Sequence, residues 1–308
     1  MSVAMLFPGQ GSQSPGMQSA LAERYPVVAS TYAEASEVLG YDLWNLVQNA
    51  PAGKLAETTL TQPAMLAAGV AAWRAWESAG GERPAQMAGH SLGEYSALVC
   101  AGALEYPDAV RVVERRAELM QAAVPAGVGA MAALLGLEDD DVVALCSAVS
   151  GSGVVEAVNF NAPGQVVIAG ETAAVHEALA QAKNRGARRA IMLPVSVPAH
   201  SSLMRGAGDA LAGVLAKTTF RAPAIPVVSA ATTVPYADAG DIRRLLAEQL
   251  YRPVRWTGTI AAMSAAGADR YIECGPGKVL AGLVRRIDKS LPVFTVEDGD
   301  SLEAAIAG

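Results

Sequence analysis

Gly89-His90-Ser91-Leu92-Gly93 decides the fold of this chain. The apolar run Pro84-Ala-Gln-Met-Ala88 precedes it, and Glu94-Tyr-Ser-Ala-Leu-Val-Cys100, typical of a helix start, follows. A Gly-x-Ser-x-Gly between a strand and a helix is typical of a nucleophile elbow, in which glycines let neighbouring backbone approach closely. The serine hydroxyl then sits at a helix N-terminus, whose N–H groups face developing negative charge. The pattern predicts acyl transfer through an acyl-serine, although it also arises by chance in a chain with 30 glycines.

The composition is typical of a soluble globular enzyme. The 308 residues are 52% hydrophobic and 17% charged, enough for one large core or two unequal domains. A net charge of −7 argues against a nucleic-acid partner, and Arg74 interrupts the apolar run 64–76 before it reaches the length of a membrane span. Three scattered cysteines form neither a metal site nor a disulfide framework. With no signal peptide, we expect a cytoplasmic protein without a metal or a membrane partner.

The order of the predicted elements indicates an α/β fold that contains an inserted domain. Residues 3–7 are predicted to form a first buried strand, and residues 225–229, 270–273 and 292–295 later strands of the same sheet. Between them, residues 130–197 show the order strand, helix, strand, strand, helix, strand, which is the ferredoxin-like unit. We therefore predict a large α/β-hydrolase-like domain with a parallel sheet over residues 1–127 and 194–308. A small ferredoxin-like α+β domain is predicted over residues 128–193.

A serine nucleophile needs a base, and the chain has three histidines. The side chain of His90, next to the nucleophile, should point away from it, and His176 lies in a helix of alternating charge and should be solvated. His200 follows a stiff loop with two prolines and is, by elimination, the best candidate base. No acid is evident between Ser91 and His200. A backbone carbonyl in place of an acid would make a Ser-His dyad, and a distant Asp stays open.

Arg116 lies on the otherwise apolar face of a helix predicted over residues 104–123. An unpaired buried charge is costly, so its guanidinium needs a partner. That partner is either a carboxylate of the protein or the carboxylate of a substrate, which suits the rigid fork of arginine. The helical pattern alone favours neither.

Two further segments bear on the site. The loop Gly9-Gln10-Gly11 follows the first strand, at the edge where α/β sites gather. A loop N–H and the N–H after the nucleophile are the usual pair of an oxyanion hole, although Gly-rich turns after strands are also common structural features. Thr61-Gln62-Pro63 is typical of a helix start, with Thr61 as N-cap and proline in the first turn.

Taken together, eight segments resemble the malonyl-CoA:acyl carrier protein transacylase family, the acyltransferases of bacterial fatty-acid synthesis. Each motif is weak alone, and the order and spacing of all eight over nearly the whole chain carry the resemblance. The segments are Phe7-Pro-Gly-Gln-Gly-Ser-Gln13, Thr61-Gln62-Pro63, Gly89-His-Ser-Leu-Gly-Glu94, Arg116, Asn159-Phe-Asn-Ala-Pro-Gly-Gln165, Val195-Ser-Val-Pro-Ala-His200, Gln249-Leu-Tyr251 and Gly275-Pro-Gly-Lys278.

The resemblance implies the catalytic roles. Ser91 would be the nucleophile and His200 its base, oriented by the main-chain carbonyl of Gln249. The main-chain N–H groups of Gln10 and Leu92 would form the oxyanion hole. The family implies a malonyl-serine intermediate, ping-pong transfer from malonyl-CoA to the phosphopantetheine thiol of acyl carrier protein, and no cofactor beyond the coenzyme A thioester itself.

The resemblance also implies the binding roles. Arg116 would pair with the free carboxylate of malonate, and Gln62 and Asn161 would line the cleft. Relatives often carry serine where this chain has Ala199, so the preference for malonyl over methylmalonyl stays open. An acidic carrier would dock on one of two basic clusters, Lys183, Arg185, Arg188 and Arg189 or Arg285, Arg286 and Lys289.

Three other functions stay open at this point. A serine hydrolase or thioesterase of the α/β-hydrolase class shares the elbow, although it would want an acid and gives Arg116 no role. A discrete polyketide acyltransferase would use the same chemistry. A non-catalytic carrier-binding protein is the third, and intact Ser91, His200 and Arg116 argue against it. Nothing in the sequence suggests an obligate partner, so we expect a monomer.

Overall fold

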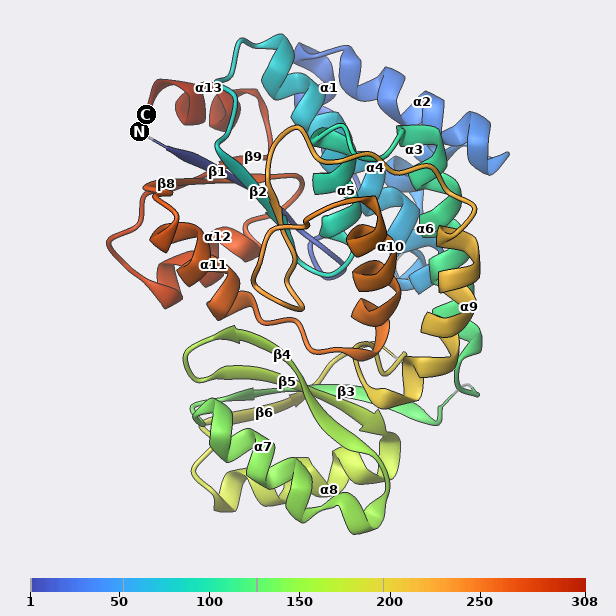
Figure 1. Ribbon diagram of the computed structural model, residues 1–308, viewed down its shortest axis with the longest axis vertical. Coiled ribbons are helices and arrows are strands. Elements are labelled where there is room, and N and C mark those ends of the chain that lie inside the picture. Colours follow the sequence, from blue (N-terminus) through green and yellow to red (C-terminus); the bar gives the residue numbers. More distant parts are fainter. Residues whose placement is uncertain (1, 52, 126, 196) are drawn as a thin grey trace.

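The large sheet is built from strands that are far apart in the sequence (Figure 1). The computed structural model describes residues 2–51, 53–125, 127–195 and 197–308. Five parallel strands have the order β7-β2-β1-β8-β9. The α/β class and the parallel sheet are therefore as predicted, although the strand expected at 225–229 is only two residues long. The strands are β1 (Val3–Phe7), β2 (Gln86–Gly89), β7 (Val227–Val228), β8 (Arg270–Cys274) and β9 (Val293–Val296).

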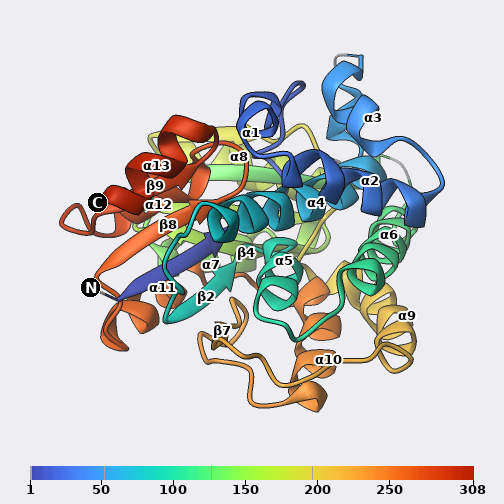
Figure 2. The ribbon, with the colours of Figure 1, turned by 90° about the horizontal axis from the view of Figure 1, so that it is seen from above.

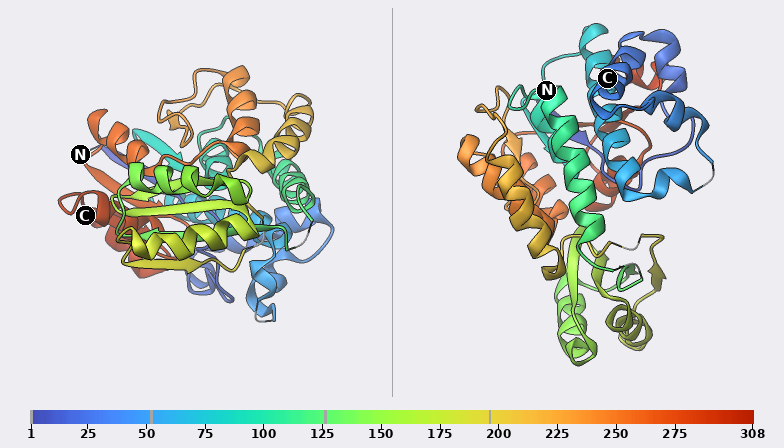
Figure 3. Two further views of the ribbon diagram at one scale, coloured as in Figure 1. Left: turned by 90° about the horizontal axis from the view of Figure 1, so that it is seen from below. Right: turned by 90° about the vertical axis from the view of Figure 1, so that its right-hand side faces the viewer.

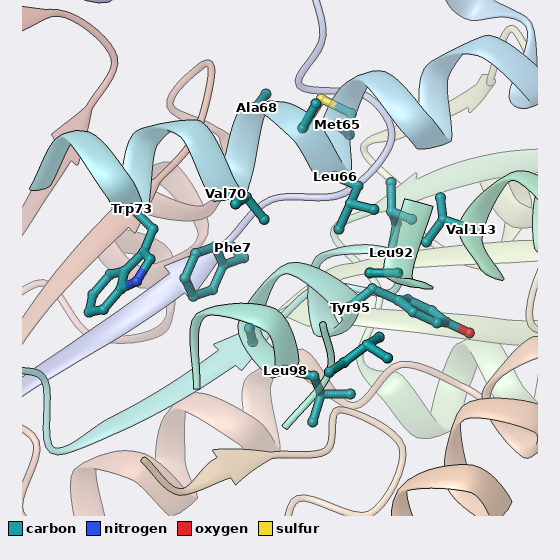
Figure 4. Close-up of a cluster of buried hydrophobic side chains, with 14 of the residues drawn as sticks. Phe7, Met65, Leu66, Ala68, Val70, Trp73, Leu92, Tyr95, Leu98 and Val113 are labelled. Carbon is teal, nitrogen blue, oxygen red and sulfur yellow. The ribbon is translucent and has the colours of Figure 1, made fainter. Parts of the chain in front are cut away.

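Helices cover both faces of this sheet, because successive residues of β1 point to opposite sides. Met5 and Phe7 belong to a core with α4 (Thr58–Ser78) and α5 (Gly93–Cys100), whereas Ala4 and Leu6 face α11 (Trp256–Ala265) and α12 (Val279–Ile287). Figure 4 shows Phe7 between Val70 and Trp73 of α4 and the side chains of α5. Parallel strands buried on both faces read as continuous apolar runs, as the strand Val3–Phe7 does.

The remaining helices of the large part pack around this centre. The α2 and α6 helices pack against α4 (Figure 2). Among the residues described, none of the helices combines the length and the apolar character needed to span a bilayer. The bounds are α1 (Ser19–Arg24), α2 (Val27–Leu39), α3 (Leu43–Asn49), α6 (Tyr106–Ala122), α9 (Arg205–Leu215), α10 (Ala239–Glu248) and α13 (Gly299–Ala307), with short 3-10 turns at Lys54–Ala56, Ser150–Ser152, Ser202–Met204 and Gln249–Tyr251.

A second, antiparallel sheet has the order β4-β5-β3-β6. Its helices α7 and α8 both lie on its outer face, as the views from the front and from below show (Figures 1 and 3). The order of elements is the predicted ferredoxin-like one, and the domain boundaries at residues 127 and 194 stay a prediction. The bounds are β3 (Gly129–Leu135), α7 (Asp139–Ala148), β4 (Val155–Ala162), β5 (Gln165–Glu171), α8 (Thr172–Asn184) and β6 (Arg189–Met192).

The last predicted strand of this sheet is shorter than expected. The sequence predicts it over residues 188–197, and the structure ends β6 at Met192. Pro194 lacks the N–H that would continue a ladder, which explains an early end. Ser196 of the same predicted strand lies outside the described residues.

Backbone and side-chain hydrogen bonds join the small sheet to the large part. Val254 donates to the carbonyl of Val158 at 2.8 Å, and Phe160 donates back to Val254 at 2.9 Å. The carboxylate of Glu156 accepts the N–H of Ser202 at 2.6 Å, two residues after His200. The inner face of the small sheet is thereby held against the segment that carries the candidate base.

Candidate active site

The predicted strand–turn–helix is present at Ser91. The strand β2 ends at Gly89, α5 begins at Gly93, and Ser91 has a left-handed backbone with φ of +52°. A Cβ added at Gly89 would collide with the backbone of the first turn of α5, and one at Gly93 would collide with the carbonyl of Phe7. Both glycines are required because two backbone segments meet here with no room for a side chain.

Ser91 and His200 are hydrogen-bonded to each other. The Ser91 Oγ lies 2.8 Å from His200 Nε2, and His200 Nδ1 lies 2.7 Å from the main-chain oxygen of Gln249. Because a carbonyl only accepts, Nδ1 carries the proton and Nε2 accepts from the serine hydroxyl. The backbone at His200 is also left-handed, with φ of +66°, and its N–H donates to the carbonyl of Leu250.

The surroundings of His200 keep its imidazole neutral. Burial and, next, the positive charge of Arg116 lower its pKa to about 3, against a smaller opposing effect of the hydrogen bond to Gln249. A neutral imidazole with a free Nε2 lone pair accepts a proton from a hydroxyl. The pair can therefore act as a nucleophile and its general base.

Arg116 reaches the same point from α6. It is 1% exposed, and its Nη2 donates to Ser91 Oγ at 3.2 Å and to Gln249 Oε1 at 3.0 Å, while Nη1 donates to Gln62 Oε1 at 2.7 Å. All three acceptors are neutral. Within the described ranges no carboxylate forms an ion pair with this guanidinium, and its Nε has no hydrogen-bond partner. Within the protein, the guanidinium of Arg116 is thus held by side-chain oxygens and not by a carboxylate in a direct ion pair.

Gln62 is positioned by α4, and the predicted start of this helix is wrong. The helix begins at Thr58, so Thr61 lies inside it. The Thr61 hydroxyl donates to the carbonyl of Glu57 at 3.0 Å and therefore does not cap an N–H. Pro63 sits within the helix, where it removes one main-chain hydrogen bond without ending it. The Gln62 amide nitrogen faces Met120 Sδ at 3.4 Å, which leaves its oxygen to Arg116.

The main-chain N–H groups of Gln10 and Leu92 are the predicted oxyanion donors: Leu92 directly follows the nucleophile, and Gln10 lies in the loop after β1. Both residues line the same cleft as Ser91. Gly9 brings the loop close, because an added Cβ there would strike the carbonyl of His90 and lie 3.7 Å from Leu92 N. Neither N–H has a hydrogen-bond partner in the described part of the chain. Two residues of the nucleophile's cleft with unpaired main-chain donors suit the predicted oxyanion hole.

In the described part of the chain, neither of the other two histidines is hydrogen-bonded to the nucleophile. His90 Nε2 contacts Asn161 Oδ1 at 2.8 Å, and its ring packs 5.3 Å from the ring of Trp256. Asn161 lies near the end of the strand β4, so this contact joins the small sheet to the elbow. His176 is exposed on α8, as the charge pattern predicts.

The sequence reasoning missed Glu94 and its partners. This carboxylate is fully buried in the first turn of α5, where its Oε1 accepts from Gln249 Nε2 at 2.8 Å and from the N–H of Ala230 at 3.2 Å. Its Oε2 accepts from the hydroxyl of Tyr236. Burial raises the pKa of Glu94 to about 7, against the lowering effect of these hydrogen bonds. In the sequence, Glu94 is an ordinary acidic residue at a helix start, and no local signal marks its partners.

A cleft of about 300 Å³ opens onto Ser91. Its walls come from the large part and from the small sheet, and many of its lining residues are apolar. Such a cleft suits a long, largely apolar arm that ends in a reactive group. The apolar wall is formed by Met131, Val167, Leu193, Val195, Val279 and Leu283.

The fold and the site define a serine acyltransferase, and a model of the acyl transferase domain matches residues 4–305. The malonyl CoA-acyl carrier protein transacylase of Salmonella typhimurium is 52% identical over 303 residues, covering 98% of each chain. The crystal structure of an acyl carrier protein S-malonyltransferase from Vibrio cholerae is 54% identical and superposes with a TM-score of 0.96 over 99% of each chain. The chain therefore belongs to the malonyl-CoA:acyl carrier protein transacylase family, as its motifs predict.

One further solved structure is described as a type II polyketide acyl-carrier protein in complex with its malonyl-transacylase. It is 50% identical to this chain, with a TM-score of 0.98 over 100% of this chain and 99% of that one.

Proposed function

We propose that this protein moves a malonyl group from malonyl-CoA to the phosphopantetheine thiol of an acyl carrier protein, through a malonyl ester on Ser91. The observation that carries this proposal is the place of Arg116, a buried cation 3.2 Å from the nucleophile with only neutral acceptors around it. An acyl group that ends in a carboxylate would give this guanidinium a direct anionic partner, which none of its three hydrogen-bond acceptors is.

The first half-reaction forms the acyl-serine. The Ser91 proton passes to His200 Nε2 as Oγ attacks the thioester carbon, and the carbonyl oxygen becomes an oxyanion. The N–H groups of Gln10 and Leu92 stabilise that charge, a contribution of about 3 kcal/mol for a donor of this kind. When the C–S bond breaks, the coenzyme A sulfur leaves with the proton from His200.

The second half-reaction runs the same steps in reverse order with a different thiol. The phosphopantetheine thiol gives its proton to His200 Nε2 and its sulfur attacks the malonyl ester. The C–O bond to Ser91 breaks, and the serine oxygen regains the proton from His200. Coenzyme A leaves before the carrier protein binds, and this order, with a covalent acyl-enzyme between the two half-reactions, gives ping-pong kinetics.

Arg116 provides the selection for a carboxylate. The N–H groups of Arg116 that would bind the malonyl carboxylate are left with only neutral oxygen acceptors when an acetyl group is bound instead. Loss of a charge-assisted hydrogen bond costs about 2–3 kcal/mol, or roughly 100-fold in kcat/KM. Selection of this kind has no purpose in a general serine hydrolase, and the carbonyl of Gln249 takes the place of the acid that such an enzyme uses.

The carrier protein docks, in this proposal, on the basic cluster at the end of α12. Arg285, Arg286 and Lys289 are exposed, and Arg286 donates to Gln165 Oε1, a side chain that lines the cleft. The same helix lines the cleft through Val279 and Leu283. The other basic cluster lies around the end of α8 and the start of β6, and none of its residues lines the cleft.

The proposed reaction also suggests where the protein acts and in which pathway. We assign the protein to the cytoplasm as a monomer that supplies the extender unit of fatty-acid synthesis, with no cofactor beyond its thioester substrates. A discrete polyketide role is the second candidate, supported by the likeness to the transacylase solved with a polyketide carrier. We infer no nucleic-acid or membrane partner.

A transfer assay tests this function. Malonyl-CoA, the protein and a phosphopantetheinylated acyl carrier protein are combined, and the carrier is weighed by mass spectrometry. Wild type should give malonyl carrier with parallel lines in double-reciprocal plots, and Ser91→Ala should give none. Ser96→Ala is the matched control, because Ser96 is a buried serine of α5, the helix that follows Ser91, and its hydroxyl has no partner among the described residues. Free malonate in place of malonyl carrier would contradict the proposal and indicate a hydrolase.

A further inference from the structure

Glu94 is a buried carboxylate that the proposed mechanism does not use. It lies three residues after the nucleophile, in the first turn of α5, with no exposed surface. Burial of a charge in the interior is costly and persists where the structure compensates for it. Three donors surround this carboxylate, namely the N–H of Ala230, the hydroxyl of Tyr236 and the amide nitrogen of Gln249.

Gln249 connects this carboxylate to Arg116. Its Oε1 accepts from Arg116 Nη2 at 3.0 Å while its Nε2 donates to Glu94 Oε1 at 2.8 Å. The orientation of the amide is fixed, because only its oxygen can face a guanidinium and only its nitrogen can face a carboxylate. One neutral amide therefore separates a buried cation from a buried anion.

We propose that Glu94 is the counter-charge of Arg116 in the free enzyme and that it competes with the malonyl carboxylate for this cation. Glu94 is thus a positioning residue that acts through Gln249 and Arg116 and limits how tightly the malonyl group is held. The proposal rests on the proposed function, since it needs an acyl group with a carboxylate.

The competition between Glu94 and the malonyl group arises because a buried site of low dielectric constant would then hold two anions and one cation. Before loading, one cation and one anion balance. A malonyl group on Ser91 adds a second anion near the single cation, and the two anions repel each other with an energy that water does not fully screen. An acetyl group adds no charge, so Glu94 is without influence on it. The repulsion is present whenever the malonyl group is in the cleft, so it lowers the equilibrium constant of loading and raises that of transfer to the carrier by the same factor.

The test is the equilibrium constant of loading. The protein is incubated with malonyl-CoA and free coenzyme A at fixed ratios until the acylated fraction, weighed as intact protein, is constant. The same series is run with acetyl-CoA. Glu94→Gln keeps the shape and removes the charge, and a pH of about 8.5 keeps Glu94 of the wild type ionised, since burial raises its pKa to about 7. The malonyl constant should rise roughly tenfold in Glu94→Gln, and the acetyl constant should not change.

Two other variants complete the test. Tyr236→Phe removes a hydrogen bond that lowers the Glu94 pKa, so a larger fraction of Glu94 is neutral and the malonyl constant should rise by a smaller factor than in Glu94→Gln. This variant serves if Glu94→Gln does not fold. Glu273→Gln is the matched control, because Glu273 is an equally buried carboxylate that caps α12 through the N–H groups of Leu280 and Ala281. It should change neither constant.

The outcomes separate this inference from the proposed function. A purely structural role for Glu94 would change the malonyl and acetyl constants by the same factor or leave both unchanged, and either result would overturn the inference. Absence of any malonyl adduct on the wild type would instead remove the proposed function, and the inference with it.

Discussion

His200 Nδ1 lies 2.7 Å from the main-chain oxygen of Gln249. The base is therefore oriented by a carbonyl, which carries no charge. A carboxylate at this position would stabilise an imidazolium, whereas a carbonyl orients the ring and leaves its pKa low. The neighbouring charge is instead Arg116, which lowers the pKa further.

The low pKa of His200 makes a prediction about stability. The group is protonated in the folded protein only below about 3, and in the unfolded chain below about 6.5. Between these values the unfolded state binds more protons, so wild type loses stability as the pH falls, by up to about 1.4 kcal/mol per pH unit from this group. His200→Asn should lack this contribution. Urea unfolding of both proteins at several pH values between about 7 and 4 measures it, and parallel pH dependences would contradict the low pKa.

Replacement of Arg116 should change selectivity. In Arg116→Ala the malonyl carboxylate loses its charged donors, and kcat/KM for malonyl-CoA should fall roughly 100-fold, while kcat/KM for acetyl-CoA falls far less. Initial rates of coenzyme A release with each thioester measure the two values. Arg115→Ala is the matched control, because Arg115 is an exposed neighbour on α6 that pairs with Glu118. An equal loss with both thioesters would show that Arg116 acts on structure and does not contact the carboxylate.

The docking proposal predicts that KM changes for only one of the two substrates, the carrier protein. Reversal of charge at the α12 cluster should raise KM for the carrier protein about tenfold and leave the rate of loading from malonyl-CoA unchanged, since surface charges act on encounter. Reversal at the other cluster is the control and should have little effect. A rise in KM for the carrier protein only in the second variant would place the docking site at the end of α8 instead. The residues to be replaced by glutamate are Arg285, Arg286 and Lys289 and, in the control, Lys183, Arg185, Arg188 and Arg189.

The elbow glycines make a prediction about packing. Gly93→Ala places a Cβ against the carbonyl of Phe7 and should lower the free energy of unfolding by about 3 kcal/mol, with loss of transfer activity. Gly282→Ala on α12 is the control, because nothing lies within 4 Å of its added Cβ. Removal of a helical glycine there should stabilise by about 0.5 kcal/mol. Chemical denaturation of both variants measures the difference, and an unaffected Gly93→Ala would contradict the close backbone approach.

The sequence predicted those parts of the fold and the site that local patterns encode. The elbow around Ser91 is a strand, a turn and a helix within about a dozen residues, and the order of the small-sheet elements follows from periodicity and turn residues. The buried face of α6 made Arg116 visible for the same reason. The residue pattern alone left the missing acid open, and the resemblance implied the carbonyl of Gln249, which the structure places 2.7 Å from His200 Nδ1.

What the sequence could not predict depends on contacts between distant segments. Glu94 meets Gln249 across 155 positions, and Tyr236 across 142. Nothing local to Glu94 distinguishes it from a solvated residue in a first helical turn. The start of α4 at Thr58 was missed because Thr61 and Pro63 have the local chemistry of a helix start, and packing around the helix outweighs it.

The central claim is that Ser91 accepts a malonyl group selected by Arg116, and competition between two thioesters tests it most directly. The protein is mixed with equal amounts of malonyl-CoA and acetyl-CoA, quenched, digested and sequenced by mass spectrometry. The account predicts a malonyl ester on Ser91 and almost no acetyl ester, with the malonyl excess lost in Arg116→Ala. Equal malonyl and acetyl esters on Ser91 of the wild type, or an acyl group on another residue, would contradict it.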